Sequence, residues 1–405
     1  MHYLKTSLLL SLLFSNTFGL EGLNSSSSHA LSSLAPEGHW AVQIEQKNRR
    51  ATTLYGNGKK EKAIGEPYSD INLNGEIFPS LALFGAEATL GKTQADIALD
   101  FDYTTVTLGY GVTKDLTVGV IVPYRKKTTT VNFSLSEGNI GVNPTFNGNQ
   151  TVSATNLPYL PTSVAGITPL TTPQLQTLLT NEFGYKPLES ITKSGFADPT
   201  VGFLYNAYSS DTDSLILGVG YNIPLAKKDD PDNLMATNIG DGNPTVRLRL
   251  EYFKELEQQF DIAGKFEYGV ELADKITKRV PKKGEFLAPK SSTERLNREI
   301  GDYRIYNVEV GKTWNNYRVA LAWHRSEKDA DHYHSSKGTE VAHLAENTQA
   351  YSSQYEGSLS WSGIEAWDRG TFPLPLVVTL NYRDTYEGKN ALKWKEVYLT
   401  LTSFF

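Results

Sequence analysis

The segment LKWKEVYLTLTSFF, residues 392–405, decides the fold. Successive side chains of a β-strand point to opposite sides, so Val397, Leu399, Leu401 and Phe405 would share one face. A strand with one apolar and one polar face needs either a protein core or lipid against its apolar side. The remainder of the chain indicates which of the two is present.

The same period-two pattern recurs upstream. In FDIAGKFEYGV (260–270), apolar and aromatic residues fall on one face, and Asp261, Lys265 and Glu267 fall on the other. In PTVRLRLEYF (244–253), apolar residues alternate with two arginines and a glutamate. Transmembrane strands of a β-barrel have this alternation because one face meets lipid and the other faces the lumen. The pattern therefore favours a barrel in a membrane.

Segments of this kind predict an all-β protein, a transmembrane antiparallel up-and-down barrel of about twelve strands with long extracellular loops. The connections support this count. Those after even-numbered strands are mostly brief, and those after odd-numbered strands are mostly long, as expected when both termini lie in the periplasm. The predicted strands span residues 38–50, 97–111, 115–133, 196–208, 214–226, 244–255, 258–271, 301–314, 316–326, 350–361, 373–385 and 392–405.

The N-terminal residues have the organisation of a secretory signal. MHYLKTSLLLSLLFSNTFG contains one lysine, a leucine-rich run and a small residue at a plausible cleavage point. The apolar run is too short to span a bilayer. We therefore expect a signal peptide at 1–19, a periplasmic or lumenal segment at 20–37, and the barrel at 38–405.

Composition excludes several other classes. The chain has no cysteine, which excludes a lipid anchor, a disulfide scaffold and a thiolate metal site. No later stretch approaches the roughly 18 consecutive apolar residues of a membrane-spanning helix. A net charge of −6 with acids and bases well mixed gives no footprint for nucleic acid. We expect no cofactor, and outer-membrane lipid as the main surroundings.

The final residue adds a localisation signal. A last strand that stops on an aromatic residue resembles the C-terminal signature of bacterial outer-membrane proteins. That resemblance implies that the barrel-assembly machinery recognises the strand ending at Phe405, and that the protein resides in the outer membrane of a Gram-negative cell.

Four stretches in the middle of the chain carry a more specific resemblance. They are YGVTKDLTVGVIVPY (110–124), LTTPQLQTLLTNEFGYKPL (170–188), GFADPTVGFLYNAY (195–208) followed by LILGVGYNIPLAKKDD (215–230), and NIGDGNPTVRLRLEY (238–252). Together they resemble the MetA-pathway phenol-degradation family, a group of transporter-like outer-membrane barrels distantly related to long-chain fatty acid transporters. The resemblance implies passive uptake of small hydrophobic or aromatic molecules. The Asn-Pro-Ala element that opens the hatch of the fatty acid transporters is absent from 23–38.

Charged residues on the polar faces of the strands should line the lumen and any substrate path. They carry both signs, so they could neutralise one another as structural ladders or form a selective constriction. A non-transporting barrel with a plugged lumen and structural or adhesive loops therefore remains an alternative. The predicted lumen residues are Asp100, Asp102, Arg247, Arg249, Glu251, Lys265, Glu267, Arg304, Glu309, Arg318, His324, Glu356 and Arg383.

The long loop 134–195 is the candidate gate. Thr172 followed by a proline predicts a helix start, and Gly184 predicts its end. The helix would present Leu175, Leu178 and Leu179 on one side. These leucines could fold into the barrel mouth and meet an apolar solute, or they could cap the loop's own core.

Catalytic and metal sites are weakly indicated. His324 and Ser326 have the spacing of the histidine and nucleophile of outer-membrane phospholipase A, also a twelve-stranded barrel. The sequence shows no third group that would orient the histidine, so we expect no catalytic residues and no enzyme. The loop sequence DADHYHS (329–335) could bind a divalent metal through His332 and His334, but it lacks a defined ligand spacing and we expect no metal site.

Overall fold

The computed structural model describes residues 34–405 except 154, 229, 236–237 and 284–286. The predicted signal peptide and most of the segment 20–37 lie outside the described residues. Within the described part of the chain, no helix is long and apolar enough to cross a membrane.

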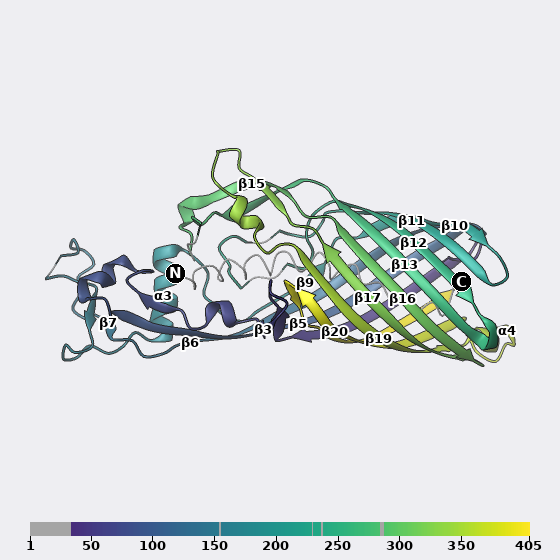
Figure 1. Cartoon of the computed structure of the whole chain (residues 1–405), viewed down its shortest axis with the longest axis horizontal. Coiled ribbons are helices and arrows are strands. Elements are labelled where there is room, and N and C mark those ends of the chain that lie inside the picture. The colour runs from purple at the N-terminus through teal and green to yellow at the C-terminus, as the bar shows by residue number, and fades with distance from the viewer. Residues whose placement is uncertain (1–33, 154, 229, 236–237, 284–286) are drawn as a thin grey trace.

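In the described ranges, twelve strands close into one antiparallel barrel (Figure 1). Each strand pairs with its neighbours in chain order, and β1 closes the ring between β22 and β5. The predicted count and up-and-down order are confirmed. The barrel strands are β1 (Trp40–Ala51), β5 (Thr89–Thr113), β6 (Leu116–Leu135), β10 (Thr200–Ser209), β11 (Asp213–Asn222), β12 (Thr245–Glu255), β13 (Phe260–Glu271), β16 (Tyr303–Trp314), β17 (Tyr317–Lys328), β19 (Ala350–Ser362), β20 (Leu376–Lys389) and β22 (Lys395–Phe404).

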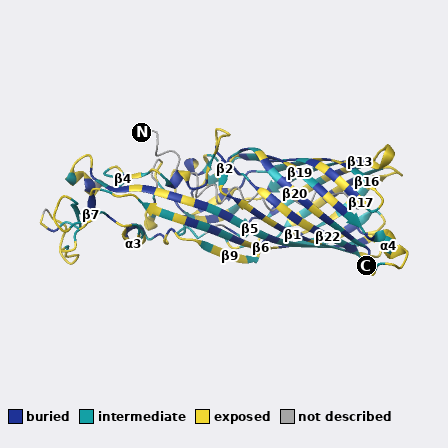
Figure 2. Cartoon of the chain, turned by 90° about the horizontal axis from the view of Figure 1, so that it is seen from below, coloured by how far each residue is buried: buried dark blue, intermediate teal, exposed yellow. Residues whose placement is uncertain are grey.

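The outer face of the barrel is apolar. Val310, Leu321 and Leu380 are exposed there, with Leu321 71% accessible. Exposed and buried residues alternate along each strand, which gives the chequered barrel wall of Figure 2. A soluble protein rarely exposes apolar surface of this extent, whereas a transmembrane barrel needs it against lipid.

The two ends of the barrel differ as the loop lengths predict. Short turns and the helix α4 (Ile364–Asp368) lie at the end that carries the C-terminus (Figure 1). At the other end β5 and β6 run far beyond the barrel and form, with the remaining loops, an extracellular extension. Its elements are β2 (Thr53–Tyr55), β3 (Glu61–Ala63), η1 (Glu66–Tyr68), β4 (Asn72–Asn74), η2 (Pro79–Phe84), β7 (Ile140–Val142), β8 (Tyr159–Pro161), α3 (Thr172–Phe183), β9 (Ile191–Phe196), β14 (Asp274–Arg279), η4 (Lys290–Ser292), β15 (Thr293–Glu299), β18 (His332–His334), η5 (Ala342–Ala345) and β21 (Ala391–Leu392); η3 (Glu257–Gln259) lies in the turn after β12.

The polarity of the two strand faces exchanges where β5 leaves the barrel. Below this level the outer face carries residues such as Val106 and Leu108, and the inner face is small or polar. Above it the inner face becomes apolar, with Leu99, Phe101 and Tyr103 all buried. These three side chains belong to the hydrophobic core of the extension, which also contains leucines of the loops and of α3. Leaving the membrane turns the outer face toward water, so the polar residues move there.

This exchange corrects three sequence predictions. Asp100 and Asp102 do not face the lumen: they lie on the outer face, where Arg50 Nε is 3.7 Å from Asp100 and Asn48 donates a hydrogen bond to Asp102. Arg304 also lies on the outer face, where its guanidinium pairs with Asp329 at 3.1 Å. All three predictions assumed that charged faces are lumenal along the whole strand, which holds only within the membrane.

Candidate functional site in the barrel lumen

One wall of the lumen is neutral and built from small residues. β5, β6, β10 and β11 are adjacent in the barrel, and their inward positions include Gly109, Gly119, Gly202 and Gly220. Threonines and aliphatic residues fill the positions between them. Because these side chains are short, the wall leaves open space inside the barrel.

A cavity of about 240 Å³ occupies this space. Thr107, Gly202, Leu204, Gly218 and Gly220 line it on the neutral side. Two arginines and a glutamate of the next two strands, β12 and β13, border it beside this wall. An apolar cavity of about 150 Å³ holds one benzene molecule, so this cavity has room for a monoaromatic solute.

The adjoining wall, formed by β12 and β13, is charged. The cavity is bordered there by Arg247, whose guanidinium binds the Glu267 carboxylate at 2.7 Å, and by Arg249, which pairs with Glu251. The Tyr303 hydroxyl donates a further hydrogen bond of 3.2 Å to Glu267. Neighbouring strands place these groups side by side, because Arg247 and Arg249 lie opposite Gly269 and Glu267 in the register of β12 and β13.

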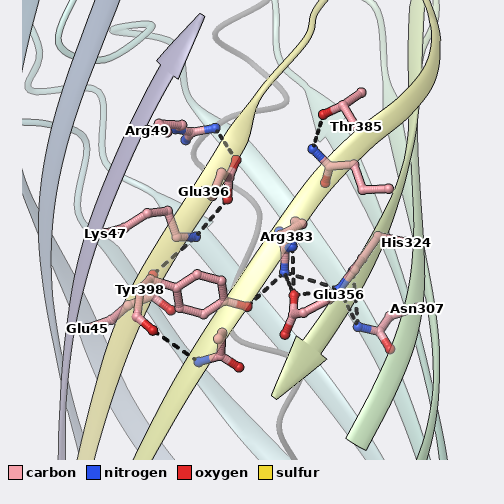
Figure 3. A network of polar contacts seen from close by, with 12 residues as sticks. Glu45, Lys47, Arg49, Asn307, His324, Glu356, Arg383, Thr385, Glu396 and Tyr398 are labelled. Atoms are coloured by element: carbon pink, nitrogen blue, oxygen red, sulfur yellow. Dashed lines mark hydrogen bonds and ion pairs between the residues drawn. The ribbon is translucent and has the colours of Figure 1, made fainter. Parts of the chain in front are cut away.

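A second group of buried charges centres on Arg383 (Figure 3). Its guanidinium contacts Glu356 at 2.5 Å and the Tyr398 hydroxyl at 3.1 Å. His324 Nε2 lies 2.9 Å from the same carboxylate, and Asn307 approaches the other ring nitrogen at 3.1 Å. Each charged group has a partner of opposite sign, which removes most of the cost of placing it inside the barrel.

A third group lies toward the periplasmic turns. Arg318 donates hydrogen bonds to Asp261 and to Glu309, both at 2.5 Å from Nη2. Its guanidinium lies directly over Gly311, where a Cβ atom would stand 2.3 Å from Nη2. Glycine at 311 is therefore needed for the arginine to reach both carboxylates.

Ten of the thirteen predicted lumen residues face the lumen, in three separate groups and not in one continuous site. Whether they act on a solute stays a prediction. These ten are Arg247, Arg249, Glu251, Lys265, Glu267, Glu309, Arg318, His324, Glu356 and Arg383.

Sequence reasoning missed the lumenal charges of the first and last strands. Glu45, Lys47 and Arg49 lie on the inner face of β1, and Arg49 pairs with Glu396 of β22 at 3.1 Å. Residues 46–50 are all polar, so polarity alone could not assign a face. The apolar alternation before them, which places Ile44 outside, was the available signal.

The His324 and Ser326 pair of the phospholipase hypothesis lies on the inner face of β17. His324 and Ser326 both point inward, away from the lipid that such an enzyme would have to hydrolyse. Contrary to the sequence prediction, groups that orient the histidine do exist, namely Asn307 and Glu356. They hold the ring toward Arg383, on a face that membrane lipid does not reach.

The predicted helix in the 134–195 loop is confirmed, but it lies in the extension. Thr171 and Gln174 form a capping box at its start, and Gly184 ends it with a φ of 64°. Leu175, Leu178 and Leu179 are buried, and the first and third belong to the extension's own core. α3 lies near the far end of β6, well away from the barrel (Figure 1).

An arginine ties the extracellular loops together. Arg279 of β14 binds Asp232 at 2.6 Å and donates to the carbonyl oxygens of Phe183 and Gly184 at the end of α3. It also stacks on the Tyr185 ring at 3.9 Å. Burial works against ionisation of Asp232, but hydrogen bonding and charge from Arg279 outweigh it and hold the pKa of this carboxyl below its usual value.

In the segment 329–335, for which the sequence predicts no metal site, the carboxylate of Asp331 is engaged in contacts with other protein groups. Asp331 binds Lys328 and accepts a hydrogen bond from the backbone N–H of Gly301. Within the described ranges, no group of three or more ligand-type side chains is arranged to hold a metal ion.

The closed barrel, its apolar outer face and its polar lumen define a transmembrane β-barrel of the kind found in bacterial outer membranes. The sequence model of a family described as "Putative MetA-pathway of phenol degradation" matches residues 129–277, which confirms the predicted resemblance over this part of the chain. No curated protein matches the chain by sequence.

Solved structures agree with the fold. The COG4313 outer membrane channel from Pseudomonas putida F1 is similar, with a TM-score of 0.54 at 11% identity over 93% of this chain and 99% of that chain. The Ralstonia pickettii toluene transporter TbuX matches at a TM-score of 0.35 and 9% identity, over 97% of this chain and 92% of that chain. The Pseudomonas putida toluene transporter TodX matches at a TM-score of 0.35 and 10% identity, over 97% of this chain and 93% of that chain. The last two scores are too low to carry an argument.

Proposed function

We propose that the protein is an outer-membrane channel for passive uptake of small hydrophobic or aromatic molecules. The cavity of about 240 Å³ against the neutral lumen wall carries this proposal, since it suits one aromatic ring and borders polar groups that are already paired. The family description, which concerns phenol degradation, supports the same class of solute.

The neutral wall supplies the path in this proposal. A solute moves along the glycines and aliphatic residues of β5, β6, β10 and β11. The van der Waals contacts that it makes there replace those that it makes with water, and the charged groups that it passes are already paired. The paired arginines and carboxylates of the adjoining strands β12 and β13 stay fixed, so the passage needs no large rearrangement. Movement follows the concentration gradient, because the site offers no means of coupling to an energy source.

Uptake by intact cells tests the proposal. Gram-negative cells that express the barrel should accumulate radiolabelled toluene faster than cells with an empty vector, at equal amounts of folded protein in the outer membrane. Equal rates in the two strains would contradict a channel function. They would leave the alternative, a barrel whose large extracellular extension serves adhesion or structure, as the better explanation.

The same proposal predicts that the barrel is not an enzyme. A Ser326→Ala variant should leave toluene uptake unchanged, and purified barrel should release no fatty acid from phospholipid vesicles. Fatty acid release by the wild type that the variant loses would establish an enzyme.

We also infer how the chain reaches its membrane. The signal peptide 1–19 is removed on export, and residues 20–37 remain with the mature barrel. The assembly machinery recognises the C-terminal strand, whose last residue, Phe405, is exposed and is hydrogen-bonded to Trp40 of the first strand. Mass spectrometry of the mature protein should find Leu20 at its N-terminus, and deletion of Phe405 should lower the fraction assembled in the outer membrane.

A further inference from the structure

Two arginines border the cavity, and they differ in how many of their N–H groups are used. Arg247 is fully engaged: its Nε and Nη2 bind Glu267 at 2.9 and 2.7 Å, and its Nη1 donates to Thr200 Oγ1 at 3.3 Å. Arg249, two residues further along β12, pairs with Glu251 through Nη2. Within the described part of the chain this is the only hydrogen bond or ion pair of the Arg249 side chain, and its Nε has no partner. The side chain is 23% accessible and lines the cavity, so it retains donors for a solute.

Glu267 offers an acceptor beside these donors. Its carboxylate receives three hydrogen-bonding contacts, and all of them go to Oε1: two from Arg247 and one of 3.2 Å from the Tyr303 hydroxyl. Among the described residues, no group donates to Oε2. Strand register places Glu267 of β13 directly opposite Arg249 of β12, and both line the cavity. Opposite residues of an antiparallel pair have Cβ atoms about 5 Å apart, so one small group can contact both side chains.

An apolar floor, formed by Leu204, Gly218 and Gly220, borders the cavity next to this pair. Gly218 of β11 lies opposite Arg249 in the register of β11 and β12. A Cβ atom at 218 would stand 3.1 Å from Arg249 Cβ and 2.7 Å from Leu204 Cδ2. Glycine at this position therefore lets Leu204 pack close to the stem of Arg249. The cavity consequently has an aliphatic side chain and bare backbone directly beside a guanidinium.

The polar pair and the apolar floor together define a class of solute. A hydroxyl group both donates and accepts, so it can accept a hydrogen bond from Arg249 while it donates one to Glu267. An aromatic ring that carries this hydroxyl would lie on the apolar floor. A hydrocarbon of the same size would displace water from both polar groups and leave them without a partner, which is unfavourable.

The same arrangement disfavours an anionic solute. Arg249 is already paired with the carboxylate of Glu251, and the carboxylate of Glu267 lies opposite it on the next strand. A carboxylate that approached Arg249 would accept hydrogen bonds but could donate none to Glu267, and the like charge of Glu267 would oppose it. The preferred solute is therefore uncharged.

We propose that Arg249 and Glu267 form a subsite for the hydroxyl group of phenols, and that the cavity prefers these uncharged hydroxylated rings to hydrocarbons of the same size. A simple phenol keeps its proton at neutral pH, as the tyrosine side chain does. Its hydroxyl donates to Oε2 of Glu267 and accepts from the guanidinium of Arg249, and its ring lies on the apolar floor. The proposal rests on the channel function proposed above and names the solute class of the same cavity.

Binding to the folded protein tests the subsite without requiring transport. Full-length mature barrel in detergent is dialysed to equilibrium against radiolabelled phenol, or against toluene, in which a methyl group replaces the hydroxyl. Micelles without protein give the blank for partitioning into detergent. Burial of a hydroxyl without partners is unfavourable, so a purely apolar cavity would bind toluene more tightly. The wild type should instead bind phenol more tightly than toluene, and benzoate more weakly than phenol.

The main variant combines Arg249→Met with Glu251→Met, because it removes both members of the ion pair and leaves neither without the other. It should weaken phenol binding about tenfold, which corresponds to about 1.4 kcal/mol and is near the lower end for a hydrogen bond to a charged group. Toluene should then bind at least as tightly as phenol. Arg249→Met alone should weaken phenol binding by the same factor.

Arg50→Met is the matched control. It removes the same charge from β1, where the side chain points outward and is 66% accessible, and it should bind phenol and toluene as the wild type does. The heat-dependent mobility shift of folded barrels in gels verifies folding of each variant. The comparison of phenol with toluene on the wild type needs no variant, so it decides the proposal even if substitution of Arg249 prevents folding.

The possible results separate the two proposals. The hydroxyl subsite would be overturned if the wild type bound toluene as tightly as phenol, if it bound benzoate more tightly than phenol, or if a folded Arg249 variant bound phenol as the wild type does. None of these results bears on toluene uptake by cells. Conversely, a preference for phenol that the Arg249 variants lose, in a protein that gives cells no toluene uptake, would retain the subsite and contradict the channel function.

Discussion

Filling the cavity beside the neutral wall should abolish passage of a single aromatic ring. Gly220 of β11 faces the cavity, directly opposite Gly202 in the strand register. A Cβ atom at 220 would stand 3.1 Å from Thr200 Cγ2 and 3.7 Å from Arg247 Cβ, so a side chain fits with a small shift of the threonine. Gly220→Leu therefore tests the cavity without breaking the backbone pairing.

The size of the effect follows from the cavity volume. Four added carbon atoms, each taking about the 30 Å³ share of a water molecule in the liquid, remove about 120 Å³. About half of the 240 Å³ cavity remains. That is less than the roughly 150 Å³ that accommodates benzene, so toluene should no longer fit.

The assay is toluene uptake by intact cells with a same-substitution control. Gly264→Leu places the same side chain on the lipid face of β13, where no atom lies within 4 Å of the added Cβ. Cells with Gly220→Leu should take up toluene at the empty-vector rate, and cells with Gly264→Leu at the wild-type rate. Wild-type uptake by the Gly220→Leu variant would refute the assignment of the cavity as the path.

Three further predictions concern buried charges. Arg318→Met leaves the carboxylates of Asp261 and Glu309 without their cation and should lower the free energy of unfolding by about 3–5 kcal/mol, measured by urea titration of barrel folded in vesicles. Additional replacement of both acids by leucine should restore most of the lost stability. An Arg318→Met variant as stable as the wild type would contradict the pairing. Arg279→Ala should lower the free energy of local opening of the extracellular loops by about 3 kcal/mol. Amide hydrogen exchange around the end of α3 should then be about a hundredfold faster, with unchanged exchange in the barrel strands. A uniform increase of exchange over the whole protein would contradict a local role of Arg279. Folding lowers the pKa of Asp232, so the stabilisation of the loop by this carboxylate is complete above the pKa of the unfolded state and is lost as the pH falls through the pKa of the folded state. Pepsin should therefore cleave 227–243 readily only below about pH 3.9. Equally fast cleavage above that pH would contradict this role of Asp232.

The barrel could be predicted from sequence because lipid imposes a strict rule on every spanning strand. β13 illustrates it: Ile262 and Phe266 face outward and Lys265 and Glu267 face inward, as the alternation requires. Short turns at one end of the barrel and long loops at the other give a second, separate signal, from which the strand count can be recovered. Local signals also sufficed for α3, since Thr171 and Gln174 at its start and Gly184 at its end directly flank or belong to the helix itself.

The lumen was less predictable because the rule changes at the membrane boundary. Asp100 and Asp102 continue an alternating strand, yet they lie above the level at which lipid ends, so water replaces lipid on the outside. Nothing in the alternation marks that level. It is marked instead by a change in the outer residues, from Val106 to Thr104, and that change has meaning only once the two faces are assigned.

Which charged side chains pair with one another in the lumen cannot be predicted from a single sequence, for another reason. Arg383, Glu356 and His324 are close because β17, β19 and β20 are neighbours with a particular register. A shift of the register by two residues preserves every inward and outward assignment but changes all the partners. Sequence alternation fixes faces, whereas ion pairs depend on register.

The long β5–β6 hairpin has a consequence for how a solute first meets the cell. Fifteen residues of β5, from Thr89 to Tyr103, lie above the last apolar position of the outer face, a length of about 50 Å along the strand. The mouth is consequently surrounded by protein that stands in the aqueous medium beyond the lipid leaflet. Under the proposed function, a dissolved molecule would meet this protein in the water before it reaches the lipid, so the rate of capture would depend on diffusion to a protruding target and not on partitioning into the membrane.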